Sequence, residues 1–271
     1  MSSIAFIGGG NMASCIIGGM VANGFDPQKI LVGTPSDNTR QRLASSFGVK
    51  TFADNHAAVA DADVVVLAVK PKMMREVVES LAPALSHQPI IISVAAGIPV
   101  AALEQWLDGS MAIVRAMPNT PSMVQSGATG LYTRATLPLE HRQLVDSMFE
   151  AIGYSCWVEE EALIDAVIAV SGSGPAYFFL VLEAMQKIAQ ELGLPKQTAE
   201  ELCLHTALGA SRMAIESGVT AADLRKQVTS PGGTTQAAIN SFQQQGLEDM
   251  FRQAMTSAVD RAQTMSKDFS S

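Results

Sequence analysis

The first residues that could do chemistry are three small residues close to the N-terminus. Gly8, Gly10 and Ala13 fit the spacing G-x-G-x-x-G/A, with Asn11 and Met12 between them. In such a segment the first glycine forms a tight turn, the second lets the backbone approach a pyrophosphate, and the third small residue allows close helix–strand packing. Because the segment stands between an apolar run and an apolar helical pattern, it predicts a dinucleotide site. A glycine-rich turn without a ligand is the alternative.

A second group of polar residues follows the next apolar run and bears on the choice of dinucleotide. An acid at this place would bond the ribose 2′-hydroxyl of NAD, but positions 31 to 35 hold none. Thr34, Ser36 and Arg40 stand there or just beyond, and hydroxyl and guanidinium groups would receive a 2′-phosphate. We therefore expect NADP(H), with NAD(H) as the alternative cofactor. Ser36 is also placed to cap the next helix, and the two roles are compatible.

The ends of the later apolar runs supply further candidates for the same crevice. In a doubly wound sheet, ligands bind outside the carboxyl ends of the strands. The candidate cofactor residues in these loops are Ala68, Val69, Lys70, Pro71, Ala95, Ala96 and Asn119. Lys70 could act on the cofactor electrostatically. For each residue taken alone, ordinary loop chemistry is the alternative.

Two glycine-rich segments in the second half of the chain precede helical patterns. In the segment from Thr229 to Thr235, free N–H groups at the helix start and nearby hydroxyls would bind a small anion such as a carboxylate. An ordinary N-cap is the alternative there. In the segment from Ser171 to Tyr177, glycines would let a cofactor or substrate approach the backbone, with a tight helix–helix junction as the alternative. The candidate substrate residues are Ser173, Ser230, Gly232, Gly233, Thr234 and Thr235.

The absence of certain residue types limits the reactions that the protein could catalyse. No lysine follows the glycine-rich helix start at Ser173-Gly174-Pro175, and the four histidines have no metal-ligand spacing, so we expect no metal site. Reduction of a ketone would need a proton donor for the developing alkoxide. A cyclic imine is basic enough to be protonated near neutral pH and then accepts a hydride directly. The pattern therefore favours imine reduction, with the cofactor supplying the hydride.

Two kinds of element must position these residues. Over residues 1–160, β-branched runs alternate with helical patterns, as in the βαβ units of a parallel sheet. The runs are Ile4–Ile7, Ile30–Val32, Val64–Val69, Ile90–Val94 and Ile113–Val114. The later patterns are all helical, at 161–170, 175–193, 196–216, 220–227, 233–244 and 247–267. We predict an α/β fold followed by an all-α part: a Rossmann-type doubly wound sheet over 1–160 and a helical substrate-binding and dimerisation domain over 161–271.

Amino-acid composition indicates which broad class of protein this is. The 271 residues are 48% hydrophobic and 16% charged, which allows a sizeable core, and the net charge of −8 argues against nucleic-acid binding through a basic face. Cys15, Cys156 and Cys203 fit neither a disulfide framework nor a zinc spacing, so we expect a reduced, cytoplasmic protein. The sequence shows no signal peptide and no uninterrupted apolar stretch of about 18 residues, so we expect no membrane association. Its apolar helices would expose too much surface in a monomer, which predicts a homodimer through the C-terminal helices.

Taken together, these motifs resemble those of the pyrroline-5-carboxylate reductase family, collinearly over essentially the whole chain. The resemblance rests on Gly8–Ala13, Ala68–Pro71, Met117–Pro121, Ser171–Tyr177 and, most specifically, Ser230–Thr235. It implies NADPH-dependent reduction of the C=N bond of L-1-pyrroline-5-carboxylate to L-proline, the last step of proline biosynthesis. It also implies a helical domain that intertwines with a partner subunit, and in some members a ring of dimers.

The resemblance also implies roles for single residues. The substrate carboxylate would lie at the helix start matching Ser230–Thr235, Thr235 matches a threonine near the imine nitrogen, and Asn55 matches a contact on the adenosine side. Thr235 and Ser230 are therefore the catalytic candidates. Two other functions fit the sequence: reduction of another small cyclic imino acid, such as a piperideine carboxylate, and a dinucleotide-binding regulator without catalysis.

Overall fold

The computed structural model describes residues 2–109 and 111–269, whose contacts form two compact units. The first unit contains the chain up to Ser173 and again from Ser257, and the second contains Gly174–Thr256. The predicted domain boundary at 160 falls just after the last strand. The contacts keep the following residues with the sheet, because Ile164 is fully buried in the core on one of its faces.

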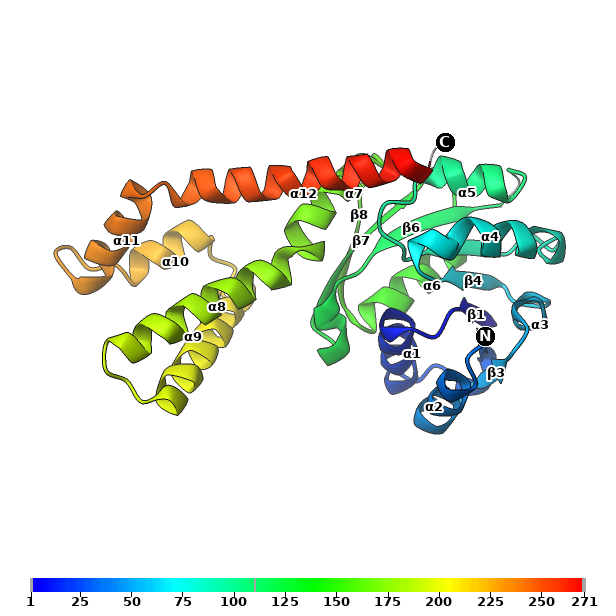
Figure 1. Cartoon of the computed structure of the whole chain (residues 1–271), viewed down its shortest axis with the longest axis horizontal. Helices are drawn as coiled ribbons and strands as arrows, with labels where there is room; N and C mark the ends of the chain where they lie inside the picture. Colours follow the sequence, from blue (N-terminus) through cyan, green and yellow to red (C-terminus); the bar gives the residue numbers. More distant parts are fainter. Residues whose placement is uncertain (1, 110, 270–271) are drawn as a thin grey trace. The chain divides into compact units, whose positions relative to one another are not determined.

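An eight-stranded sheet forms the centre of the first unit (Figure 1). The strand order is β3-β2-β1-β4-β5-β6-β7-β8; β7 runs antiparallel to β6, and the other neighbours are parallel. The strands are β1 (Ile4–Ile7), β2 (Ile30–Gly33), β3 (Lys50–Phe52), β4 (Val64–Leu67), β5 (Ile90–Ser93), β6 (Ile113–Met117), β7 (Gly127–Thr133) and β8 (Gly153–Trp157). The strand order reverses between β1 and β4, which is the switch point where doubly wound folds bind ligands.

The β-branched runs predict β1, β2, β4, β5 and β6, and the structure confirms all five. The predicted ends of β4 and β5 were too late, because these strands stop at Leu67 and Ser93, whereas β6 continues through Arg115 to Met117. Strands β3, β7 and β8 were not predicted. Strands β3 and β8 are the sheet edges, and β7 contains two glycines, so none of the three has a continuous β-branched run.

Helices cover both faces of this sheet (Figure 1). One face packs against α1 (Asn11–Ala22), α2 (Asp37–Phe47) and α6 (Leu139–Glu150). The other face packs against α3 (Asn55–Val59), α4 (Pro71–Leu81), α5 (Val100–Trp106) and α7 (Leu163–Val167). All four residues of β1 and of β4 are buried, as expected for parallel strands between two helical layers. Short helical turns, η1 (Pro27–Lys29), η2 (Ala82–Ala84) and η3 (Thr120–Val124), lie in the connections.

Parallel pairing brings several loops to one edge of the sheet. Ile7 pairs in register with Gly33 on one side and with Leu67 on the other, so β1, β2 and β4 end at the same level. The Gly8 N–H donates to the Gly33 carbonyl (2.9 Å), and the Ala68 N–H donates to the Ile7 carbonyl (2.8 Å). The carboxyl edge of the sheet therefore gathers the glycine turn and the loops that follow β2 and β4.

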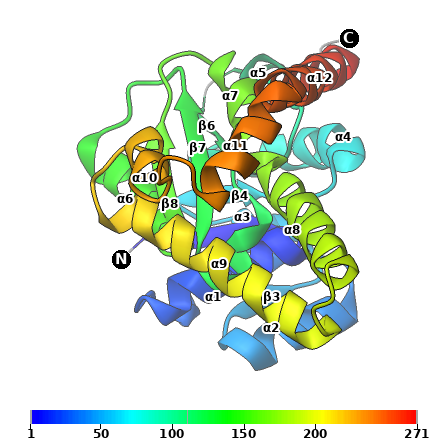
Figure 2. The same ribbon diagram turned by 90° about the vertical axis from the view of Figure 1, so that its left-hand side faces the viewer.

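The second unit is helical. Helices α8 and α9 form a hairpin whose two arms lie side by side (Figures 1 and 2). The helices are α8 (Gly174–Glu191), α9 (Lys196–Glu216), α10 (Ala221–Gln227), α11 (Thr234–Gln244) and the first part of α12 (Leu247–Phe269). The structure confirms the five helical patterns predicted from 175 onward, to within a few residues. The pattern predicted at 161–170 divides into α7 and a π-helical segment, η4 (Ile168–Gly172).

One helical run is apolar enough to deserve comparison with a membrane span. Among the described residues, Leu163–Glu191 is long and apolar enough to cross a membrane, judged by length and composition alone, with a mean hydropathy of 1.5. Helices that pack against other parts of a protein can be equally long and apolar, so a single such run is weak evidence for a transmembrane helix. Phe178, Phe179 and Leu180 in this run are each more than 60% exposed. Contiguous apolar surface of this kind is typical of a protein–protein interface or a membrane contact.

Candidate functional site

The glycine turn after β1 has the conformation that the sequence predicts. Gly8 has a φ of +98°, and a Cβ added there would lie 2.7 Å from the Ala68 carbonyl oxygen, so only glycine fits. A Cβ added to Gly10 would meet none of the described atoms within 4 Å. Ala13 is fully buried in the core between α1 and the sheet. The turn is thus tight at Gly8, open at Gly10 and closely packed at Ala13.

The start of α1 leaves its backbone N–H groups available. Gly10 is the N-cap, no described side chain caps the helix, and its first turn contains no acid. The first backbone bond of the helix runs from the Ser14 N–H to the Gly10 carbonyl (2.9 Å). The earlier N–H groups, including those of Asn11 and Met12, are therefore free to bind an anion at the positive end of the helix dipole.

The loop after β2 holds the three polar residues predicted to select the dinucleotide. Thr34 is buried, and Ser36 accepts a hydrogen bond from the Thr39 N–H (3.4 Å), which confirms that it caps α2. The Arg40 guanidinium donates to the Thr34 carbonyl (2.7 Å) and pairs with Asp37 (3.0 Å). Arg40 therefore lies at the end of β2, but a neighbouring carboxylate already compensates its charge.

Asn55 is the first residue of α3 and lies against the end of β2. A Cβ added to Gly33 would be 2.7 Å from the Asn55 side-chain oxygen. This oxygen is buried and has no hydrogen-bond partner within the described part of the chain. Because an unpartnered buried acceptor is costly, the position is suited to a donor supplied by a ligand.

The loops after β4 and β5 lie at the same edge. Lys70 is the exposed N-cap residue of α4 and Pro71 is its first residue, so the start of a second helix follows Ala68 and Val69. The Val94 N–H donates to the Leu67 carbonyl (3.2 Å), which places Ala95 and Ala96 beside the end of β4. The structure therefore brings the predicted residues that follow four strands, β1, β2, β4 and β5, to one edge of the sheet.

Asn119, beyond β6, joins this edge to the second glycine-rich segment. Its amide nitrogen donates to the Ser171 carbonyl (2.9 Å), and its amide oxygen accepts from the Ala128 N–H (2.9 Å). The Ser173 N–H donates to the Ile168 carbonyl (2.7 Å) and closes the π-helical segment. Single π-helical turns often occur at functional sites. The bond from Asn119 to Ser171 thus places Ser173 near the carboxyl end of β6.

The predicted anion segment in the second unit opens α11. Gly232 has a φ of +73°, and Gly233 is the N-cap of the helix. Among the described residues, no side chain caps Gly233 and no acid lies in the first turn. Ser230, Gly232, Thr234 and Thr235 are exposed. The Gly233 N–H donates to the Ser230 carbonyl (3.0 Å), so the N–H groups of Thr234 and Thr235 and the nearby hydroxyls are the groups that a carboxylate could reach.

Four residues that shape these two helix starts are not among the predicted site residues. A Cβ added to Gly9 would lie 2.5 Å from Thr39, and the Arg42 guanidinium donates to the Gly9 carbonyl (3.0 Å) and to Ser14 (3.1 Å). At α11, the Gln236 side chain accepts from the Gly232 N–H (2.6 Å). A glutamine at the third helical position can reach back in this way, so Gln236 was detectable from sequence. Contacts between α2 and the glycine turn were not.

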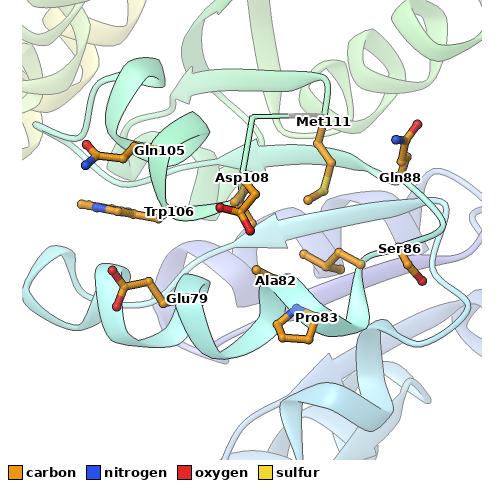
Figure 3. Close-up of a pocket in the computed structure, with 11 residues that line it drawn as sticks. Glu79, Ala82, Pro83, Ser86, Gln88, Gln105, Trp106, Asp108 and Met111 are labelled. Carbon is orange, nitrogen blue, oxygen red and sulfur yellow. The ribbon is translucent and has the colours of Figure 1, made fainter.

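A cavity of about 740 Å³ lies away from these residues (Figure 3). Its walls include Glu79 and Pro83 from α4 and η2, and Trp106 and Asp108 from the end of α5. These segments precede β5 and β6, so the cavity is at the amino edge of the sheet, opposite the glycine turn. None of the predicted site residues lines it. Within the described residues, no cluster of three or more metal-ligating side chains was found.

The fold and the uncapped glycine turn at the carboxyl edge of the sheet define a Rossmann-type oxidoreductase that uses a nicotinamide dinucleotide. Comparison with known proteins agrees with this class and narrows it. Residues 161–265 match the model for the pyrroline-5-carboxylate reductase dimerisation domain, and residues 3–97 match that for NADP oxidoreductase, coenzyme F420-dependent. The dimerisation match indicates that the chain forms a homo-oligomer.

Similarity to individual proteins extends over nearly the whole chain. The pyrroline-5-carboxylate reductase of Pseudomonas aeruginosa is 49% identical over 96% of this chain and 95% of its own. That of Vibrio alginolyticus is 43% identical over 98% of each chain. The solved structure of the Coxiella burnetii reductase is 46% identical, with a TM-score of 0.94 over 98% of both chains. The chain belongs to the pyrroline-5-carboxylate reductase family.

Proposed function

We propose that this protein reduces L-1-pyrroline-5-carboxylate to L-proline with NADPH as the hydride donor. The observation that carries the proposal is the identity to reductases of that name over nearly the full length of the chain. The missing proton donor agrees with reduction of an imine, and the resemblance to the family indicates which imine. The protein is therefore an oxidoreductase of proline biosynthesis.

The residues of the first unit suit a dinucleotide. The side of the turn at Gly10 is open, and α1 presents free N–H groups to a pyrophosphate. The buried Asn55 oxygen can accept a hydrogen bond from a donor on the adenosine side. Thr34, Ser36 and Arg40 would receive the 2′-phosphate. We assign the remaining cofactor contacts to the loops that start at Ala68, Ala95 and Asn119. When bound, the reduced nicotinamide supplies the hydride.

The chain's own groups then bind and orient the imino acid. The start of α11, within the segment from Ser230 to Thr235, holds the substrate carboxylate through the N–H groups of Thr234 and Thr235 and the nearby hydroxyls. The Thr235 hydroxyl accepts a hydrogen bond from the iminium N–H and so orients the C=N bond. Because the iminium already carries its proton, the reaction needs no acid from the protein.

Kinetics of variants at the start of α11 tests this assignment. Thr235→Val and Ser230→Ala should lower kcat/KM for the imino acid by about 10-fold or more, the effect of removing one hydrogen bond to a charged group. The dissociation constant for NADPH should stay unchanged. Thr264→Val is the matched control, since the Thr264 hydroxyl bonds within α12 to the Asp260 carbonyl (2.8 Å). Unchanged kcat/KM in Thr235→Val and Ser230→Ala would remove the assigned roles.

The same assay separates the two other functions. A higher kcat/KM with a piperideine carboxylate than with pyrroline-5-carboxylate would make the protein a reductase of the larger ring. Binding of NADPH without turnover of either imine would make it a regulator. A preference for NADH over NADPH would contradict the roles given to Thr34, Ser36 and Arg40.

The assembly we propose is a homodimer through the helices of residues 161–271, with a ring of dimers as a larger form. The exposed apolar side chains of α8 and α9, including Phe178, Phe179 and Leu208, supply the contact surface. The same contact accounts for the apolar run Leu163–Glu191 without a membrane, in keeping with a cytoplasmic enzyme. A mass near 28.6 kDa by sedimentation at micromolar concentration would contradict the dimer.

A further inference from the structure

Arg42 on α2 holds the glycine turn from its outer side. Its Nη2 donates to the Gly9 carbonyl (3.0 Å) and to the Ser14 hydroxyl (3.1 Å). The Ser14 hydroxyl in turn donates to the Gly10 carbonyl (2.9 Å). The Gly9 carbonyl is therefore held on the side of the turn that faces α2, whereas the Gly10 carbonyl is held within the first turn of α1.

The direction of these carbonyls fixes the direction of the opposite N–H groups. In a planar trans peptide the C=O of one residue and the N–H of the next point in opposite directions. Holding the Gly9 carbonyl toward Arg42 therefore turns the Gly10 N–H away from α2. Glycine gives this segment wide conformational freedom, so an external contact is needed to keep one orientation. The start of α2 is a firm support, because Thr39 packs directly against Gly9.

The charge of Arg42 differs from that of its neighbour Arg40. Arg40 pairs with Asp37, whereas Arg42 takes part in none of the ion pairs found within residues 2–109 and 111–269. A guanidinium without a carboxylate lies here beside the positive end of the α1 dipole. The positive charge of Arg42 and the positive end of the α1 dipole repel each other. A bound anion would reduce this repulsion, so the arrangement favours anion binding.

We infer that Arg42 is a positioning residue for the dinucleotide: it fixes the Gly9 carbonyl and thereby turns the Gly10 N–H toward the bound pyrophosphate. This inference rests on the proposed function, because it assumes the pyrophosphate at the start of α1. The pyrophosphate is common to NADPH and NADH. Arg42 therefore affects the affinity for both dinucleotides equally, whereas a residue that reads the 2′-phosphate affects NADPH alone.

The test measures NADPH and NADH dissociation constants by titration, and steady-state kinetics, for the full-length protein. Arg42→Gln should raise both dissociation constants about 10-fold, as expected for the loss of one charged hydrogen bond, and leave their ratio unchanged. The KM for NADPH should rise in parallel, while kcat at saturating NADPH stays within about twofold. Arg42→Lys, whose ammonium can reach one acceptor, should recover part of the affinity for both.

Arg75→Gln is the matched control, because Arg75 is an exposed arginine of α4 that pairs with Glu79 (2.9 Å). It should leave both dissociation constants unchanged. Unchanged affinities in Arg42→Gln would overturn the inference, and so would a loss confined to NADPH. If Arg42→Gln does not fold, Arg42→Lys decides: wild-type affinity for both dinucleotides overturns the inference, and an equal loss for both supports it.

Binding and turnover by the wild-type protein distinguish failure of the proposed reaction from failure of the role of Arg42. Wild-type protein that binds NADPH but does not reduce pyrroline-5-carboxylate removes the proposed reaction and leaves the effect of Arg42 on binding measurable. Wild-type protein that binds neither dinucleotide removes the cofactor site and the inference with it.

Discussion

The Arg115 guanidinium in the middle of β6 donates to the Glu161 carboxylate across 3.2 Å, and both side chains are largely buried. The same carboxylate oxygen accepts from the Val100 N–H (2.7 Å) at the start of α5. Its second oxygen pairs with Arg134 (3.4 Å). Glu161 therefore ties the sheet, the start of α5 and the segment before α7 together, all within the first unit.

Removing the charge of Glu161 should destabilise the first unit strongly. Glu161→Gln leaves the buried Arg115 cation without its partner, and the free energy of unfolding should fall by about 3 kcal/mol. Urea unfolding measures this change. Glu104→Gln breaks the more exposed pair with Arg134 (3.0 Å) and should cost less than about 1 kcal/mol. Equal losses of unfolding free energy in the two variants would show that the buried pair contributes no more to stability than the exposed one.

Gly8→Ala and Gly10→Ala should separate folding from cofactor binding. Gly8→Ala places a Cβ at a positive φ against the Ala68 carbonyl and should lower the free energy of unfolding by about 2 kcal/mol or more. Gly10 has a φ of −72°, which alanine adopts readily, and open space beside it. Gly10→Ala should keep wild-type stability and weaken NADPH binding, because its Cβ occupies the space of the pyrophosphate. Thermal unfolding and NADPH titration check the pair, and full affinity in Gly10→Ala would contradict the proposed site.

Asn119→Asp should lower activity by releasing the segment that carries Ser173. The substituted side chain cannot donate to the Ser171 carbonyl, so stability should fall by about 2 kcal/mol and kcat/KM should fall with it. Asn23→Asp is the matched control, because Asn23 also donates to a carbonyl, that of Gly19 (2.9 Å), at the far end of α1. The control should lose similar stability and keep its kinetics. A fall in kcat/KM of equal size in both variants would show a general effect of instability.

His56 should titrate above its ordinary range. The hydrogen bond to the Asp54 carboxylate (2.9 Å) is the main cause that raises the pKa of His56, followed by the bond to the Ser80 carbonyl (3.0 Å). The hydrogen bond with His56 is also the main cause that lowers the pKa of Asp54. The contribution of His56 to stability is therefore present below the ordinary pKa of histidine and is lost as pH rises through the raised pKa. That of Asp54 is present above the ordinary pKa of aspartate and is lost at low pH.

The pair should thus stabilise most between roughly pH 4 and pH 6.5. NMR titration of the His56 ring measures its pKa directly. Asp54→Asn should return this pKa toward the ordinary value, whereas Asp26→Asn, at another capping position, should leave it unchanged. A His56 pKa that is the same in wild-type protein and in Asp54→Asn would contradict the assigned cause.

Sequence by itself determined the class of fold and the local conformation of the two glycine-rich helix starts. Continuous β-branched runs are typical of parallel strands between two helical layers, so β1, β2, β4, β5 and β6 were predictable, and so were the helices from Gly174 onward. Gly8 and the segment from Ser230 to Thr235 were also predictable, because turns with positive φ and uncapped helix starts depend on local residue types.

Tertiary structure alone decided the features that depend on partners distant in the chain. β3, β7 and β8 gain their conformation from pairing at or near the sheet edges, since their own residues do not favour a strand strongly. Arg40 turned out to be paired with Asp37, while Arg42, two residues further along α2, reached the glycine turn. Sequence spacing places both arginines after β2, but the packing of α2 on Gly9 determines which of them contacts the turn.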